Sequence, residues 1–352
     1  MKLGGIPQSP VEVMATLLGL LPQPLLETQI AMLLARTIME GSRLGVFAAL
    51  KGQPLTAEEI AARCGAQPQA LAKLLNALAG CQYLHYEVDH DAARYSLATV
   101  ARKWLIPHAP QSLHDKMLMQ FFEWDSFAHL PEFLRTGKPL DLHGSLSSDD
   151  WGLYQRGMRA TSSTWAPEVG KRTPVPKGAK DMLDIGGSHG LLSAAICRRH
   201  PGLRSVVLDL PEALEHAAPL LAGEKMGDRV VHRAGNALTD DLGTEAWDLV
   251  FVSSLVHHFD DATNRALAQR IARSLRPGGI FVIQEHFRPA TPQQAGQIGA
   301  LLDLFFALTS QAGTWSFEEM AGWQREAGLK PLKPIKFVTA PGNGQQSAVR
   351  RR

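Results

Sequence analysis

Asp184-Ile185-Gly186-Gly187-Ser188-His189-Gly190 is a glycine-rich turn between an apolar run, residues 181–185, and a helical pattern, residues 191–199. A strand, such a turn and a helix in this order are typical of α/β proteins. Glycines at the turn let a ligand touch the backbone at the carboxyl end of the strand. The turn therefore predicts a parallel sheet with a binding site at its edge.

Apolar strands and helical segments alternate after this turn. The strands are continuous apolar runs, which is typical of a parallel sheet that helices cover on both faces. We expect seven strands, which are Asp181–Ile185, Arg204–Leu208, Val230–Arg233, Trp247–Val252, Gly279–Gln284, Ile335–Thr339 and Gln346–Arg350.

The spacing of the glycines bears on the ligand. It is not G-x-G-x-x-G, and no nucleoside-triphosphate loop is present, so a dinucleotide or triphosphate is poorly supported. Asp184 would repel pyrophosphate but suits an ammonium group, such as that of a methionine moiety. Asp209 ends the second strand, where a carboxylate can accept from both ribose hydroxyls. The alternatives are that the turn binds no ligand and that Asp209 only caps a helix. The glycine turn and Asp209 together favour a nucleoside ligand.

Composition sets broad limits on the class of protein. The 352 residues are 45% hydrophobic and 20% charged, which fits a globular protein of about two domains rather than a disordered or fibrous chain. The 36 basic and 34 acidic residues leave a net charge of +2, too balanced for a chain that binds by neutralising phosphates. Three scattered cysteines and the absence of a membrane-length apolar run or signal peptide predict a cytoplasmic protein.

The amino-terminal part predicts a winged helix. A long helix is expected over residues 25–50, with Gly41 and Gly45 marking breaks or close packing. Thr56 with Glu59 forms a capping box that opens a helix ending at Gly65. A second helix, Pro68–Leu78, precedes two short strands around Asp89-His90-Asp91.

Winged helices often bind DNA, and the charge of this segment bears on that alternative. Residues 51–104 hold six basic and five acidic side chains, and the second helix carries one lysine, Lys73. Such a face neither neutralises phosphates nor reads bases, so no nucleic-acid partner is expected.

A helical, aromatic-rich middle segment follows, and most of its aromatic side chains are expected in the core. Thr173-Pro174-Val175-Pro176-Lys177-Gly178 breaks any helix and predicts a boundary. The expected division is a winged-helix domain, 1–110, a connecting segment that lines an acceptor pocket, 111–177, and a nucleoside-binding domain, 178–352.

The motifs together resemble a known family. They are similar to those of class I S-adenosylmethionine-dependent methyltransferases, above all the small-molecule O-methyltransferases of the caffeic acid and hydroxyneurosporene type. The resemblance implies an α/β fold, with a Rossmann-like seven-stranded methyltransferase sheet preceded by a mainly α winged-helix dimerisation domain. It also implies a homodimer with no metal and no membrane partner. The motifs are 184–190, Leu208-Asp209-Leu210-Pro211, Gly235-Asn236-Ala237, Val256-His257-His258-Phe259 and Leu275-Arg276-Pro277-Gly278-Gly279.

The resemblance also implies which residues bind S-adenosyl-L-methionine. The glycine loop would cradle the cofactor, an acid would hold its ribose, and Phe259 would pack on its adenine. Asn stands where the family usually has Asp beside the adenine, and its carbonyl can still accept from the adenine amine. The implied cofactor residues are Asp184, Gly186, Gly187, Gly190, Asp209, Leu210, Asn236, Ala237, Ser253 and Phe259.

His257 falls on the general base of the family, and Glu285 matches the first of two glutamates that orient it. An imidazole can accept the proton of a phenol as transfer proceeds. The alternatives are a solvated helix start and a metal site, the latter without spaced further ligands. The second glutamate is missing, because Thr314 stands at its position and Trp315 at that of an arginine. A weaker base, a more acidic acceptor or catalysis by proximity would fit this departure.

The acceptor pocket is expected to include Met158, Phe306 and Ser310, each of which could equally be core. The predicted activity is methyl transfer to a hydroxyl of a small aromatic or polyketide-like metabolite. Alternatives are transfer to nitrogen or carbon, a non-methylating family member, and a winged-helix transcription factor that senses a ligand.

Overall fold

The computed structural model describes residues 4–89 and 92–351. Contacts divide the chain into two compact units, Met1–Phe122 and Glu123–Arg352, each with its own hydrophobic core. Helices α10 (Ser148–Ser163) and α11 (Ala166–Arg172), which were expected in the connecting segment, belong to the second unit.

The first unit begins with short helices that lead into α3 (Ala31–Arg43). The helical stretch expected over residues 25–50 is interrupted at Gly45, one of the two glycines expected to mark a break or close packing, which adopts φ 80° and separates α3 from α4 (Val46–Ala49). A left-handed residue ends a helix, and glycine adopts this conformation without a Cβ penalty. The preceding elements are α1 (Pro10–Leu17), α2 (Gln23–Leu25) and a π-helical segment, η1 (Leu26–Ile30).

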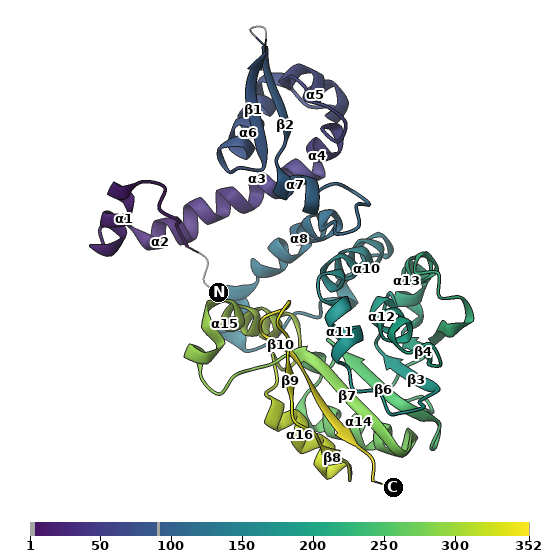
Figure 1. Cartoon of the computed structure of the whole chain (residues 1–352). Helices are drawn as coiled ribbons and strands as arrows, with labels where there is room; N and C mark the ends of the chain where they lie inside the picture. The colour runs from purple at the N-terminus through teal and green to yellow at the C-terminus, as the bar shows by residue number, and fades with distance from the viewer. Residues whose placement is uncertain (1–3, 90–91, 352) are drawn as a thin grey trace. The chain divides into compact units, whose positions relative to one another are not determined.

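A helix-turn-helix and a hairpin complete the first unit (Figure 1). Thr56 and Glu59 cap α5 reciprocally, as predicted. The hairpin strands pair antiparallel, and the predicted turn residues His90 and Asp91 lie outside the described residues. The elements are α5 (Ala57–Cys64), α6 (Pro68–Gly80), β1 (Leu84–Asp89), β2 (Ala92–Leu97) and α7 (Thr99–Trp104), followed by α8 (His114–Phe127).

The second unit is built on a sheet of order β5-β4-β3-β6-β7-β10-β8, in which the first five strands are parallel and β10 is antiparallel. The chain order reverses between β3 and β6, and ligands of open α/β sheets bind at such a switch point. The strands are β3 (Asp181–Ile185), β4 (Arg204–Asp209), β5 (Val230–Ala234), β6 (Trp247–Ser253), β7 (Leu275–His286) and β10 (Asn343–Val349).

The described sheet has eight strands rather than the expected seven. Strand β10 pairs with two short segments, β8 (Lys330–Pro331) and β9 (Ile335–Lys336), at different points along its length. The expected strand 335–339 is therefore only β9, and β8 was missed. Two-residue strands leave no periodic signal in a sequence.

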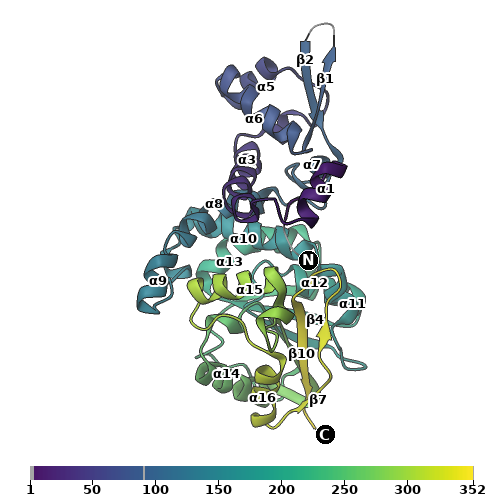
Figure 2. The same cartoon turned by 90° about the vertical axis from the view of Figure 1, so that its left-hand side faces the viewer.

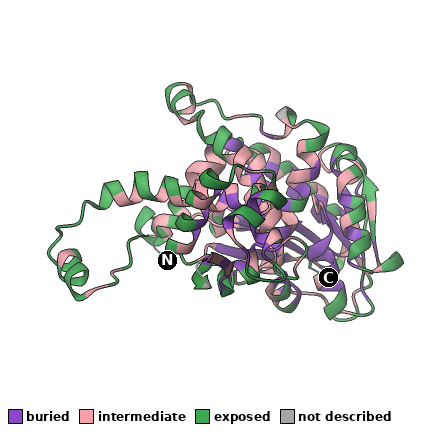
Figure 3. Ribbon diagram, turned by 90° about the horizontal axis from the view of Figure 1, so that it is seen from above, coloured by how far each residue is buried: buried purple, intermediate pink, exposed green. Residues whose placement is uncertain are grey.

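Helices cover both faces of the sheet. Phe251 and Val250 are neighbours in β6 that enter different cores, because successive side chains of a strand point to opposite faces. Helices α11, α12 (Leu191–Arg199) and α13 (Pro211–Gly223) supply residues to one core, and α14 (Asp261–Ser274) and α16 (Phe317–Glu326) to the other. Figure 2 shows α14 and α16 together beside β7, and Figure 3 shows the sheet strands as mostly buried.

The other helical segments of this unit are short, apart from α15. In the described part of the chain, no helix has the length and apolar character needed to span a membrane. The segments are α9 (Leu130–Thr136), η2 (His143–Ser145), η3 (Gly227–Arg229), η4 (Val256–His258) and α15 (Pro292–Thr309).

Candidate active site

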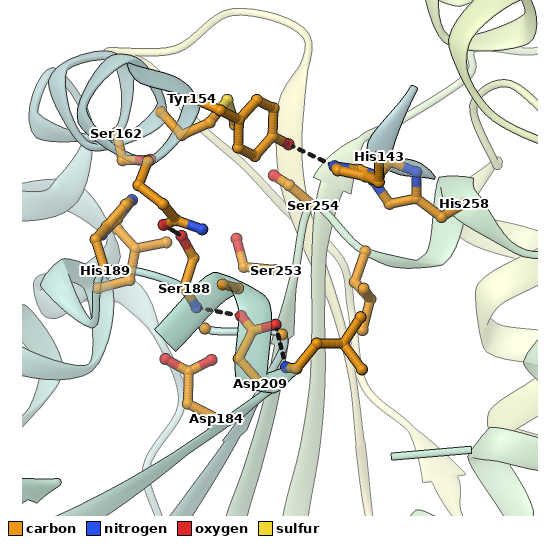
Figure 4. Close-up of a pocket in the computed structure, with 18 of the residues that line it drawn as sticks. His143, Tyr154, Ser162, Asp184, Ser188, His189, Asp209, Ser253, Ser254 and His258 are labelled. Carbon is orange, nitrogen blue, oxygen red and sulfur yellow. Dashed lines mark hydrogen bonds between the residues drawn. The ribbon is translucent and has the colours of Figure 1, made fainter. Parts of the chain in front are cut away.

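A pocket of about 220 Å³ lies at the carboxyl ends of β3, β4 and β6 and is closed on one side by α10 (Figure 4). The predicted residues Asp184, Gly186, Gly187, Asp209 and Ser253 line it. Leu210, Phe259 and Met158 line it as well.

The glycine loop passes close to its own strand. A Cβ on Gly187 would lie 2.5 Å from the carboxyl group of Asp184 and 2.7 Å from Val207. Gly186 and Gly190 adopt φ 68° and 70°, which disfavours side chains. Gly190 is the N-cap residue of α12 and is not among the residues that line the pocket, so the expected direct contact of Gly190 with the cofactor stays a prediction.

Asp184 is buried at the floor of the pocket, with 1% of its surface exposed. The Ser193 hydroxyl donates to its Oδ2 at 2.6 Å, while its Oδ1 has no partner in the described residues. Burial raises the pKa of Asp184 to about 7, and the charge of Asp209 adds to this. A cationic donor from a ligand would supply the missing partner.

Asp209 is held by the backbone. Its Oδ2 accepts from the Ser188 amide at 2.7 Å and its Oδ1 from the Leu210 amide at 2.8 Å. Each carboxylate oxygen keeps a second lone pair, so the side chain can still accept two ligand hydroxyls. Burial raises the pKa of Asp209. Gln155 of α10 accepts from the Ser188 hydroxyl, which ties α10 to the glycine loop.

Asn236 and Ala237 are not among the residues that line this pocket. The Oδ1 of Asn236 accepts from the Leu238 amide at 2.9 Å in a local turn. Ala237 packs against the core that contains α14. The Asn236 oxygen that was expected to accept from the adenine amine thus already accepts one hydrogen bond from the Leu238 amide.

His257 and Glu285 meet beside the pocket although they are far apart in sequence. His257 Nδ1 lies 3.0 Å from both oxygens of Glu285, and the two residues are 4% and 1% exposed. An ionised carboxylate only accepts, so Nδ1 carries the proton in this pair and Nε2 keeps a lone pair. In the described residues, no group of three His, Cys, Asp or Glu side chains is arranged to hold a metal ion.

The position of the missing second glutamate is occupied differently. The Thr314 amide donates to Asp303 Oδ1 at 3.0 Å, and its hydroxyl also contacts this oxygen. The Trp315 indole donates to the Val256 carbonyl at 3.0 Å, next to His257. The contact of Thr314 with Asp303 was not expected, although an acid in the apolar run Leu301–Leu308 was a signal for it.

The expected acceptor residues lie around the histidines. The Phe306 ring centroid is 4.4 Å from that of His257, and Ser310 Oγ is 3.3 Å from His258 Nδ1. Sequence reasoning missed His143, Tyr154 and His258, which also line the pocket. The signal for α10 was spacing, because one helix face carries Trp151, Tyr154, Gln155, Met158 and Ser162.

Asp184 yields a pH prediction. Its pKa rises from a usual value of 3.8 to about 7, so between these values the folded state binds more protons than the unfolded state and stability falls as pH rises. Asp184→Asn removes this penalty, which amounts to at most ~4 kcal/mol at pH 8. We expect the ligand-free variant to melt above the wild type at pH 8, with a smaller gap at pH 5. Equal melting temperatures at both pH values would contradict the burial of an ionisable Asp184.

Comparison with known proteins decides the family. A model described as the O-methyltransferase domain matches residues 143–329, more than half of the chain. The chain belongs to the O-methyltransferase family. A second model, the O-methyltransferase dimerisation domain, matches residues 31–107 and covers the helix-turn-helix and hairpin. The winged helix is thus part of a dimerisation domain rather than of a transcription factor.

Relatives of this O-methyltransferase span most of its length. The chain is 26% identical to 3-hydroxy-5-methyl-1-naphthoate 3-O-methyltransferase of Streptomyces sahachiroi over 328 residues. The aligned residues cover 90% of this chain and 91% of the relative. It is 26% identical over 271 residues to acetylserotonin O-methyltransferase of Bos taurus, and these residues cover 72% of this chain and 76% of that relative. Human N-acetylserotonin methyltransferase in complex with SAM superposes with a TM-score of 0.83 at 18% identity, over 99% of this chain and 100% of that one, which supports the fold.

Proposed function

We propose that this O-methyltransferase moves the methyl group of S-adenosyl-L-methionine to a hydroxyl of a small aromatic or polyketide-like molecule. The pair of His257 and Glu285 beside the pocket carries the proposal. The naphthoate enzyme and the tetracenomycin 8-O-methyl transferase of Streptomyces glaucescens, which is 28% identical over 331 residues (89% of this chain, 92% of that protein), support this acceptor class.

The pocket fits this cofactor. The unpartnered Oδ1 of Asp184 would accept from its ammonium group, and the free lone pairs of Asp209 from its ribose hydroxyls. The bare backbone at Gly187 leaves room for close approach. When bound, the cofactor supplies a methyl group activated by a sulfonium. We propose that Leu210, Ser253 and Phe259 complete the cofactor site.

His257 would remove the acceptor proton at Nε2. Glu285 holds Nδ1–H, so the ring cannot turn that proton toward the acceptor. The same carboxylate stabilises the imidazolium as the proton arrives. Phe306 packs on the imidazole and would keep water from it. Met158 and Ser310 would help to shape the acceptor pocket.

The proposal is tested by supplying methyl-labelled S-adenosyl-L-methionine with a panel of hydroxynaphthalenes and polyketide phenols. We expect a labelled methyl ether, located by mass spectrometry, and its loss in Asp209→Ala, which removes the ribose acceptor. Glu212→Ala, an exposed change in the first turn of α13, is the matched control and should keep the activity. Labelled product in Asp209→Ala at wild-type cofactor concentrations would contradict the assigned ribose contact.

A second candidate is transfer to nitrogen. Thr314 bonds to Asp303, and no second glutamate supports His257 at this position. An amine acceptor can lose its proton to water and needs less of a base. The relative N,N-dimethyltransferase OxyT of Streptomyces rimosus is 27% identical over 264 residues, covering 71% of this chain and 74% of that protein. A labelled methylamine from matched aminoarenes, with no ether formed, would favour this candidate.

We further propose that the protein is a homodimer. Helices α1 to α3 expose large apolar side chains, among them Leu17 at 76% and Leu33 at 52%. Such a patch is costly in water, and a dimerisation domain gives it a partner of the same chain. Light scattering after size exclusion should give twice the 38.4 kDa chain mass. A monomer at micromolar concentration would contradict this.

A further inference from the structure

Three imidazoles stand in a row at one end of the pocket. The ring centroids of His257 and His258 are 4.1 Å apart, and those of His258 and His143 are 4.7 Å apart. His143 also stacks on Trp151, with centroids at 5.5 Å and planes at 19°. Figure 4 shows His143 and His258 side by side, on the opposite side of the pocket from Asp184. Among the residues that the structure describes, a carboxylate bonds to His257 and to neither of the other two rings.

His143 and His258 each have one ring nitrogen beside a hydroxyl. His143 Nε2 lies 3.1 Å from the Tyr154 hydroxyl, and His258 Nδ1 lies 3.3 Å from the Ser310 hydroxyl. When both hydroxyls donate, the other nitrogen of each ring carries a hydrogen. Burial raises the pKa of Tyr154, which keeps this donor protonated. The two rings can then offer two N–H groups to one ligand.

The surrounding charges leave this end of the pocket uncharged before a ligand binds. No lysine or arginine is among the residues that line the pocket. Burial lowers the pKa of His258 and of His143, and a second proton on His257 would lower both further. The other titratable groups nearby are Glu285, bonded to His257, Asp141, which acts on His143, and His286, whose pKa burial also lowers.

We propose that His143 and His258 bind a carboxylate on the ring of the acceptor, so that the preferred substrates are hydroxyaryl carboxylic acids. This inference rests on the proposed O-methyl transfer. A buried carboxylate needs donors, and these two side chains are ionisable donors next to His257. One ring can take up a proton as the anion binds, and its hydroxyl partner then accepts from the ring instead of donating to it. The anion and this proton together leave the pocket neutral.

The test compares acids with their methyl esters as acceptors. The probes are the ortho and meta isomers of hydroxynaphthoic acid and hydroxybenzoic acid, each with its ester, and the readout is kcat/KM for methyl ether formation. We expect the wild type to prefer an acid over its ester by about 10- to 100-fold, the value of a charge-assisted hydrogen bond. The preference for the acid should fall as pH rises above neutrality, because the proton that is taken up with the carboxylate is lost. The rates with the ester should not show this decrease.

His258→Phe and His143→Phe keep an aromatic ring and should each reduce the preference at least several-fold. Both acceptors are measured on the same variant, so a loss of folded enzyme cancels from the ratio. Ester preference in the wild type, or an acid preference unchanged in both variants, would overturn the inference while leaving O-methyl transfer intact. Absence of transfer to any hydroxyl would instead overturn the proposed function, and the inference with it.

Discussion

Replacing His257 by alanine is expected to lower kcat for methyl transfer by about 10²–10⁴-fold, the usual contribution of a general base. The imidazole is the group beside the pocket that Glu285 holds at Nδ1, and its Nε2 keeps a lone pair. The measurement is the initial rate at saturating cofactor and acceptor. Binding of S-adenosylhomocysteine should be unchanged, because His257 does not line the cofactor pocket.

Glu285→Gln is the matched change for this prediction. Glutamine keeps the size of the side chain and can still accept from the Val256 amide, which donates to Glu285 at 3.1 Å. It removes the charge that stabilises the imidazolium, so we expect a smaller loss, about 10- to 100-fold. Undiminished turnover of the true acceptor by His257→Ala would show that proximity alone drives transfer.

Gly187→Ala should weaken cofactor binding. The new Cβ would lie 2.5 Å from the Asp184 carboxyl carbon, a distance that forces the loop or Asp184 to move. Overpacking of this kind costs about 1–3 kcal/mol, and the moved carboxylate would no longer meet a bound ammonium group. We expect the affinity for S-adenosylhomocysteine, measured by calorimetry, to fall by at least ~10-fold.

Gly202→Ala is the control for the glycine loop. Gly202 lies in the turn between α12 and β4, where an added Cβ would meet no atom within 4 Å. This variant should melt and bind as the wild type does. If Gly187→Ala bound the cofactor equally well, the close approach at this loop would have no role in binding.

The glycine turn and its neighbours were predictable because their signals are local. Strand β3 and helix α12 have the bounds that the sequence predicts. An apolar run, a required left-handed glycine and a helical period depend only on adjacent residues. Strand β7 begins at Leu275 rather than Gly279, since Leu275 pairs with Trp247 across an irregularity that no local pattern reveals.

The helical middle segment shows the limit of periodicity. The expectation that its aromatic side chains lie mostly in the core is wrong, because Trp124 and Phe127 are exposed and Trp151 and Tyr154 line the pocket. Core and pocket faces of a helix are both apolar, so their sequence patterns coincide. Only packing of α10 above the carboxyl ends of the strands distinguishes them.

By itself, the sequence determined the parallel sheet, the glycine loop and Asp184 and Asp209 at two strand ends, since each follows from a short run of residues. The pairing of His257 with Glu285, the contact of Thr314 with Asp303 and the row of His143, His258 and His257 were decided by tertiary structure. These contacts join side chains from distant segments. Their distances depend on how strands and helices pack, which no spacing along the chain records.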